Sequence, residues 1–140
     1  MKRLDISSII YYGRFYCHND PLYYLDLNNY SVYKKSELIN NFGIEENILL
    51  DNYVLQNDYG FALIFRVNMI DVMREFLNSL NNKKLSSKIK DLDSEQLYIF
   101  FQKHIEIFTG DHQRWIMYEK KCLTESALKW CNELHIPYDV

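Results

Sequence analysis

The sequence predicts an α+β fold, with a small antiparallel, hairpin-based sheet near the N-terminus packed with a helical C-terminal half. Two patterns carry this prediction: alternating aromatic and apolar residues around an Asn pair in residues 23–33, and apolar residues at helical spacing from residue 68 onward. The chain has 140 residues, of which 48% are hydrophobic, and only 4 Gly and 2 Pro interrupt it. We therefore expect a single domain, residues 1–140, with a sizeable core.

The segment YYLDLNNYSVY, residues 23–33, predicts a β-hairpin. If the Asn28–Asn29 pair forms a two-residue turn, Tyr24 lies opposite Tyr33. Because side chains alternate along a strand, one face is apolar and should pack on the core. That face holds Tyr23, Leu25, Leu27, Tyr30 and Val32. Tyr24 and Tyr33 belong to the other face, where we expect them to contact each other rather than to stack nucleic-acid bases, so that changing both to Ser leaves a folded, slightly weaker protein.

The other elements before residue 68 are shorter. The N-terminal segment DISSIIYYGRFY is compatible with helix or strand, and we favour helix. A short helix is predicted over residues 36–41, ended by Gly43. One or two further strands are predicted within residues 53–67, where β-prone runs flank Asp58, Tyr59 and Gly60.

From residue 68 the pattern predicts successive helices. Asn68 is a suitable N-cap for the first, the Asn81–Asn82 pair ends it, and a short segment with Leu85 and Ile89 follows. Ser94 can cap a third helix that reaches Gly110. Because this third helix is apolar around most of its circumference, we expect it to be the central, most buried element.

Two more helices are predicted to complete the chain. One surrounds Trp115, Tyr118 and Cys122, and the other begins at Thr124. Pro137 prevents the last helix from continuing.

Composition excludes several classes of function. The net charge of −3 and pI near 5.8 give no overall basic footprint for nucleic acid. No apolar run of membrane-spanning length and no signal-peptide cleavage site is present, so we expect a cytoplasmic protein without a membrane partner. Cys17, Cys122 and Cys131 are widely spaced, which predicts reduced thiols packed in the core. The set of His112, Cys122, Cys131 and His135 matches no compact zinc pattern, and we expect neither metal nor cofactor.

The C-terminal stretch QRWIMYEKKCLTESALKWCNELHIPY has the spacing W-x-x-Y-E-x-x-x-L-x-E-x-A-x-x-W, followed by Ile136. This resembles the end of the UPF0158 family of small uncharacterised bacterial proteins, and YYLDL resembles the Y-x-L-D strand of the same family. The resemblance spans roughly residues 22–138 and implies an α+β fold in a bacterial cytoplasm, with no established activity. Where the family often has a Gly and an Ala-Phe-Arg-Arg-Phe-like run, this chain reads LYIFFQKHI, so an anion-binding role for those arginines does not carry over.

A non-catalytic interaction or regulatory module, with another protein as its partner, is the function that the sequence favours. The candidate partner-binding residues are aromatic or charged and cluster near the C-terminus, because Trp, Tyr and Arg dominate interface energetics. They are Arg114, Trp115, Tyr118, Glu119 and Trp130. The competing interpretation is that both tryptophans anchor the core and that Arg114 forms a local ion pair. The oligomeric state is left open.

Two alternatives remain. The first is a weak RNA or single-stranded DNA binder that uses aromatic and cationic side chains together. Its candidates are Lys83, Lys84, Lys88 and Lys90 with Tyr24 and Tyr33. The second is an enzyme with an unrecognised site, although G-x-S-x-G, H-E-x-x-H and Walker-type motifs are missing and no catalytic residue stands out. Asp91, Asp93 and Glu95 more simply favour a helix N-terminus.

Overall fold

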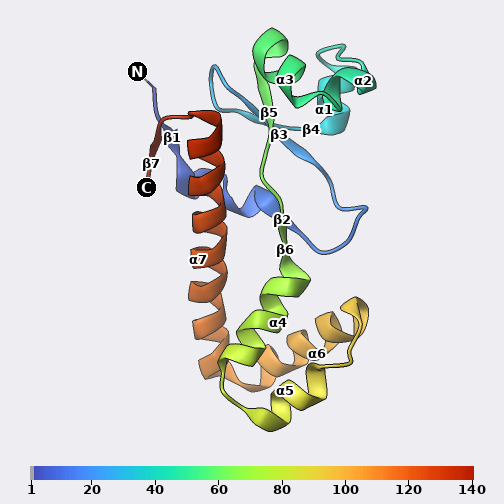
Figure 1. The fold of residues 1–140 in the computed structure, drawn as a ribbon, viewed down its shortest axis with the longest axis vertical. Coiled ribbons are helices and arrows are strands. Elements are labelled where there is room, and N and C mark those ends of the chain that lie inside the picture. Colours follow the sequence, from blue (N-terminus) through green and yellow to red (C-terminus); the bar gives the residue numbers. More distant parts are fainter. Residues whose placement is uncertain (1) are drawn as a thin grey trace.

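The computed structural model describes residues 2–140 and has an elongated shape (Figure 1). Helix α7, Thr109–Leu134, runs along the long axis, with the sheet near one end and a group of shorter helices at the other. These shorter helices are α4 (Met69–Ser79), α5 (Lys83–Ile89) and α6 (Ser94–Ile107). The predicted α+β class, with its helical C-terminal half, is confirmed. No helix within residues 2–140 combines the length and apolarity needed to cross a membrane.

The antiparallel sheet has the order β4-β3-β5, with β3 (Tyr23–Asp26) between β4 (Val32–Lys34) and β5 (Phe61–Leu63). Tyr24 lies opposite Tyr33 and Leu25 opposite Val32, which confirms the predicted hairpin register. The strand β5 comes from a segment well downstream and pairs with the other edge of β3. This third strand stabilises the hairpin, because an isolated two-stranded hairpin is only marginally stable in water.

The turn of this hairpin differs from the prediction. The loop spans residues 27–30 rather than two Asn residues, because the Asp26 carboxylate accepts hydrogen bonds from the backbone N–H groups of Asn28 and Asn29. The Tyr30 N–H then donates to the Asp26 carbonyl at 2.8 Å. Tyr30, and not an Asn, adopts the left-handed conformation, with φ of 62°. Its hydroxyl donates to the Lys2 carbonyl, which helps to hold this conformation in place.

Both faces of the sheet are buried, so the expected outer face is wrong. Leu25 belongs to the main core, whereas Tyr24, at 2% exposure, belongs to a second core with Leu38, Leu55 and Phe61. Tyr33 is half-buried against this second core and pairs with the ring of Phe42 rather than that of Tyr24. The segment between β4 and β5 folds over the sheet and covers the face that alternation alone assigned to solvent.

That covering segment is mostly helical. It contains α1 (Lys35–Asn40), α2 (Glu46–Leu49), α3 (Asn52–Val54) and a π-helical turn, Leu55–Tyr59. The prediction of one or two strands within residues 53–67 is confirmed by β5, but the strand structure lies only after Gly60. Before it, the Asp51 carboxylate caps the Val54 N–H and starts a helix. The turn ends at Gly60, which adopts φ of 75°, and strand structure begins only at Phe61.

Two short parallel pairings connect distant parts of the chain. β1 (Leu4–Asp5) pairs with β7 (Tyr138–Asp139), which brings the described ends of the chain side by side (Figure 1). β2 (Arg14–Phe15) pairs with β6 (Val67–Asn68). Between β1 and β2 the chain forms two 3₁₀ turns, Ile6–Ser8 and Ile10–Gly13, in the segment where helix was favoured.

The helix starts follow local capping rules with one shift. Asn68 caps α4, as predicted, by accepting from the Ile70 and Asp71 N–H groups, and Asn82 caps α5. Helix α6 is capped by Asp93, which forms a capping box with Gln96, rather than by Ser94.

The two helices expected after Gly110 form one continuous helix, α7. Thr124 starts no new helix, because Leu123, Ala127 and Cys131 continue a single buried stripe at a spacing of four residues. The helix ends where His135 adopts φ of 57° and the Ile136 N–H donates to the Cys131 carbonyl.

Helix α6 is not the most buried element, contrary to the prediction. Within α6, Leu97 and Phe101 are the buried residues, and they contact the core. Several of its other large apolar side chains face outward, among them Tyr98, Ile99 and Ile107. A helix at the end of an elongated molecule has core on one side only, so its opposite apolar side is left without cover.

Candidate functional site

The outward side of α6 forms an apolar groove with the end of α5. Its volume is about 560 Å³. One wall is a stripe on α6 at helical spacing, formed by Gln96, Phe100, Lys103 and Ile107. The remaining lining residues are Lys88, Leu92, Ile99, His104 and Phe108.

Large apolar side chains on this surface are unusually open to solvent. Ile107 is 70% exposed, Phe108 is 53% exposed and Ile99 is 48% exposed. Isolated exposed apolar residues are common on protein surfaces, but a contiguous group beside a hollow marks an interaction surface. The groove therefore exposes a group of large apolar side chains around a hollow.

The groove also has a one-sided charge. Lys88 and Lys103 line it, and the residues that line it, all within the described part of the chain, include no carboxylate. The Lys88 ammonium lies 5.1 Å from the centre of the Phe100 ring, which is a cation–π contact. The groove thus combines two cationic groups with large apolar side chains.

Both ends of the groove are fixed by polar contacts. The Arg74 guanidinium donates to the carbonyls of Ile89 and Leu92, at 2.7 and 2.8 Å, and so holds the connection between α5 and α6. At the other end, His104 Nε2 lies 2.9 Å from Asp111 Oδ2, which joins the end of α6 to the start of α7. The walls are therefore held in place by contacts within the chain itself.

The predicted partner-binding tryptophans lie in the core. Trp115 and Trp130 are each 8% exposed. Trp115 packs on Phe101, with ring centres 4.7 Å apart, and the Trp130 indole N–H donates to the Leu63 carbonyl. Their side chains act as core anchors, which was the competing interpretation.

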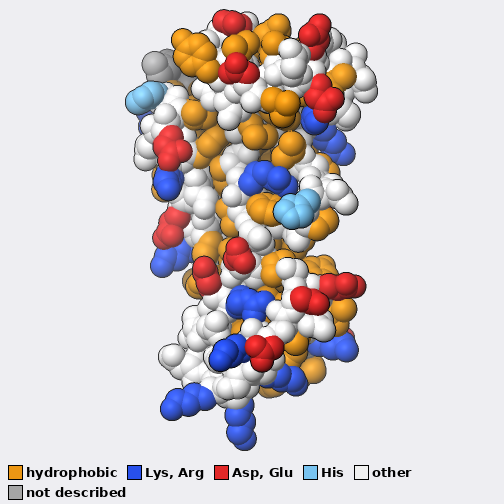
Figure 2. Space-filling view, turned by 45° about the vertical axis from the view of Figure 1, so that its right-hand side comes forward, with side chains coloured by type: hydrophobic (Ala, Val, Ile, Leu, Met, Phe, Trp, Pro, Cys, Tyr) orange, Lys and Arg blue, Asp and Glu red, His pale blue; other side chains and the backbone are white. Residues whose placement is uncertain are grey.

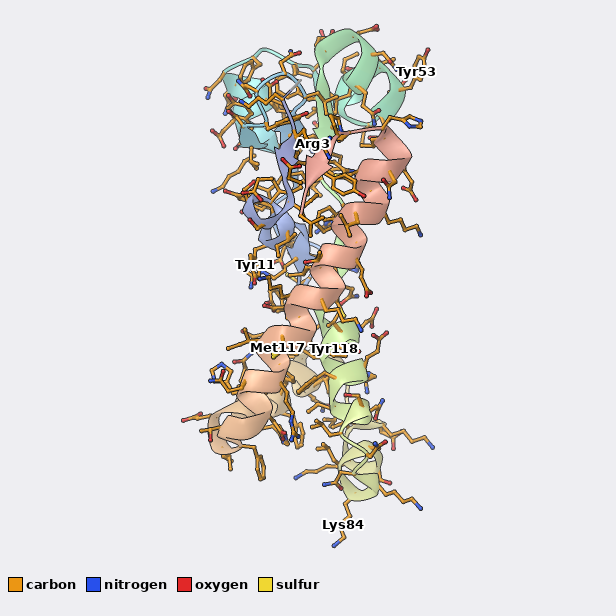
Figure 3. All side chains as sticks on the ribbon, turned by 90° about the vertical axis from the view of Figure 1, so that its left-hand side faces the viewer. Arg3, Tyr11, Tyr53, Lys84, Met117 and Tyr118 are labelled. Atoms are coloured by element: carbon orange, nitrogen blue, oxygen red, sulfur yellow. The ribbon has the colours of Figure 1, made fainter. Side chains whose placement is uncertain are left out.

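The polar members of that predicted set are dispersed around α7. Arg114 is exposed and lies 3.4 Å from the Asp111 carboxylate, so it forms the expected local ion pair. Tyr118 is half-buried and packs on Phe76, with ring centres 5.4 Å apart. Figure 3 labels Tyr118 beside Met117 on α7.

Glu119 instead faces the N-terminal segment. Its carboxylate lies 3.8 Å from the Arg14 guanidinium. Burial raises the pKa of Glu119 above its ordinary value, and the nearby Arg14 guanidinium opposes that rise. Arg14 also stacks on Tyr11, next to a second, smaller hollow lined by Tyr12 and other tyrosines.

The residues of the nucleic-acid alternative are not brought together. Lys83, Lys84 and Lys88 belong to α5, and Figure 2 shows Lys and Arg side chains gathered at the narrow lower end of the molecule. Figure 3 places Lys84 at this end, whereas the sheet that contains Tyr24 lies near the other. Lys90 is exposed just after α5, Tyr24 is buried and Tyr33 is half-buried.

The three thiols are free and differ in exposure. Cys131 is buried, which confirms its expected core position, and burial raises its pKa to about 11. Cys17 is exposed, contrary to prediction, and its Sγ lies 3.2 Å from the Asp20 carboxylate. Residues 2–140 contain no group of three or more His, Cys, Asp and Glu side chains arranged to hold a metal ion.

The sequence contains one signal for the groove. Helix α6 is apolar nearly all round, because it also carries Tyr98, Ile99, Phe100 and Ile107, and that pattern alone predicts a central helix. However, Lys103 lies within the same stripe, and a charged side chain is almost never fully buried without a partner. An apolar stripe interrupted by Lys103 therefore indicated a surface rather than a core.

Comparisons of this chain with protein-family models, with curated proteins and with solved structures each found no match.

Proposed function

We propose that this protein is a non-catalytic interaction module that binds another protein through the groove on α6. The observation that carries the proposal is the contiguous exposed apolar surface of Ile99, Ile107 and Phe108 beside a preformed hollow. Burying such side chains in a complex removes apolar surface from water, which favours association at about 25 cal/mol per Å² before the costs of binding. Ile99 and Ile107 are not needed to attach α6 to the core, because Leu97 and Phe101 are buried there and Phe100 and Ile105 pack against it.

The nucleic-acid alternative receives less support. Single-strand binding requires exposed aromatic side chains next to cations. The exposed lysines on α5 are separated from Tyr24, which lies in the second core. The ring that Lys88 does approach, Phe100, is half-buried in the groove. Membership of the UPF0158 family and a bacterial cytoplasmic setting are part of our proposal and rest on the C-terminal motif described above.

Site-specific photo-crosslinking in the source cell tests the proposed function. A photoreactive phenylalanine analogue replaces Ile107 in one variant and Tyr53 in the control. Tyr53 is 77% exposed and lies near the other end of the molecule (Figure 3), so it reports non-specific contacts at equal accessibility. We expect a discrete crosslinked species from position 107 that is absent from position 53 and is lost when Ile99→Ser is added.

Equal crosslinking from both positions, or none from position 107, would contradict the proposal. Ile99 and Ile107 are surface side chains, so substitution there should leave the thermal unfolding midpoint close to that of the parent.

A further inference from the structure

We infer that the occupant of the groove is an amphipathic α-helix whose polar flanks carry carboxylates; this inference rests on the proposed function. The first reason is the backbone chemistry of the walls. The groove is lined by side chains of α5 and α6 and of the short connections at their ends, and helical backbone N–H and C=O groups are already paired internally. An extended segment would find no strand edge there to pair with, whereas a helix brings its own hydrogen bonds.

The second reason is length. From Gln96 to Ile107 the α6 stripe extends about 16 Å, or about three helical turns. A partner helix places apolar side chains at i, i+4 and i+7 along about 10 Å, which fits beside this stripe. Phe100 and Ile107 present apolar surface at matching intervals.

The third reason is charge. Lys88 and Lys103 line the groove, no carboxylate lines it with them, and neither takes part in a described salt bridge. A partner with Glu or Asp on the flanks of its apolar face would place those groups next to these two ammonium groups. A basic partner would meet like charge at the same positions.

The same charges disfavour a second copy of this chain as the occupant. A symmetric dimer uses the same patch on both subunits, so the two grooves would face each other. Each copy would bring Lys88 and Lys103 toward those of its partner, with no carboxylate in the groove to compensate. An acidic amphipathic helix would cover the apolar surface and also place carboxylates next to Lys88 and Lys103.

Three fluorescently labelled peptides of about 14 residues, long enough to cover the stripe, are the probes for binding by fluorescence anisotropy. The first has Leu on one face and Glu on both flanks, the second has Lys in place of each Glu, and the third is the Glu peptide with a central Pro that prevents a continuous helix. We expect the Glu peptide to bind in the micromolar range and the other two to bind at least about tenfold more weakly.

Matched variants separate groove contacts from overall charge. K88E combined with K103E should weaken binding of the Glu peptide by about tenfold and strengthen that of the Lys peptide. K83E combined with K84E makes the same change in net charge outside the groove and should leave the ratio of the two affinities close to that of the parent. I107S should weaken binding of every peptide that uses the groove.

The possible failures are distinguishable. If the Lys peptide or the Pro peptide binds as tightly as the Glu peptide and depends on Ile107, the inferred occupant is wrong but the groove is a binding site. If native mass spectrometry shows a dimer that I107S dissociates, the occupant is a second copy. If no peptide binds, the inference is overturned, and crosslinking at position 107 decides separately whether the proposed function stands.

Discussion

The indole N–H of Trp130 donates a 3.1 Å hydrogen bond to the backbone carbonyl of Leu63, a residue 67 positions earlier in the chain. This bond attaches the end of α7 to the last residue of β5, next to the packed ring of Phe65. It connects the helical half with the sheet and explains why Trp130 lies in the core rather than at an interface.

Replacing Trp130 should separate this hydrogen bond from packing. Trp130→Phe keeps most of the apolar contact and leaves the Leu63 carbonyl without its donor, so we expect a loss of about 1 to 3 kcal/mol in unfolding free energy. Trp130→Ala also removes the packing and should cost about 3 to 5 kcal/mol. Urea denaturation measures both, and an unchanged Trp130→Phe variant would show that the bond contributes nothing.

Tyr24 should be far more sensitive to substitution than an outer-face tyrosine. It is 2% exposed within the second core, so Tyr24→Ala is expected to cost about 3 to 5 kcal/mol. Tyr33→Ser should cost less, because that ring is half-buried. Tyr53→Ser, at a site 77% exposed, is the control and should stay within about 0.5 kcal/mol of the parent. Comparable urea midpoints for Tyr24→Ala and Tyr53→Ser would contradict the second core.

Two Gly to Ala substitutions should change the stability of the protein in opposite directions. Gly110 lies in the first turn of α7 with open space around it, so Gly110→Ala should stabilise the protein by about 0.4 to 1 kcal/mol. At Gly13 an added Cβ would overlap the Phe65 ring, so Gly13→Ala should destabilise it. Thermal unfolding of both variants tests the close approach of the Ile10–Gly13 turn to Phe65, and a stabilised Gly13→Ala variant would refute it.

Glu119 should make the protein less stable as the pH rises through the pKa of its carboxyl group. Burial raises its pKa in the folded state, so its contribution to stability is complete below the unfolded pKa and is lost as pH rises through the folded value. Glu119→Gln should therefore raise the unfolding midpoint at pH 7, whereas Arg14→Gln, which removes the opposing cation, should lower it. As the pH rises from about 4 to 7, the unfolding midpoint of the parent should therefore decrease relative to that of Glu119→Gln. A lower midpoint for Glu119→Gln at neutral pH would contradict this assignment.

The three cysteines should react in the order of their exposure. Cys17 is exposed and should be alkylated first by iodoacetamide at about pH 8, with half-buried Cys122 slower. Cys131 is buried with a pKa raised to about 11, so it should react only after denaturation. Mass spectrometry of the alkylated peptides measures the order, and early modification of Cys131 would show that the end of α7 opens readily.

Features that depend on neighbours a few residues apart could be predicted from the sequence. A turn centred on Asn28–Asn29 placed Tyr24 opposite Tyr33, alternation placed Leu25 in the core, and Asn68 caps α4 where a cap is expected. Alternation and capping act over a single turn or strand pair, so a local pattern is sufficient to predict them.

What each apolar face contacts depends on long-range packing and could not be predicted from the sequence. Alternation could not show that the segment around Leu38 and Leu55 folds back over Tyr24, because that contact joins distant parts of the chain. Because α6 carries apolar residues on nearly all sides, its sequence could not show which side packs on the core and which side has no packing partner. Burial depends on packing partners that folding brings together, such as Trp130 and Leu63. At the end of an elongated molecule, apolar side chains that could have filled a core line an open groove instead.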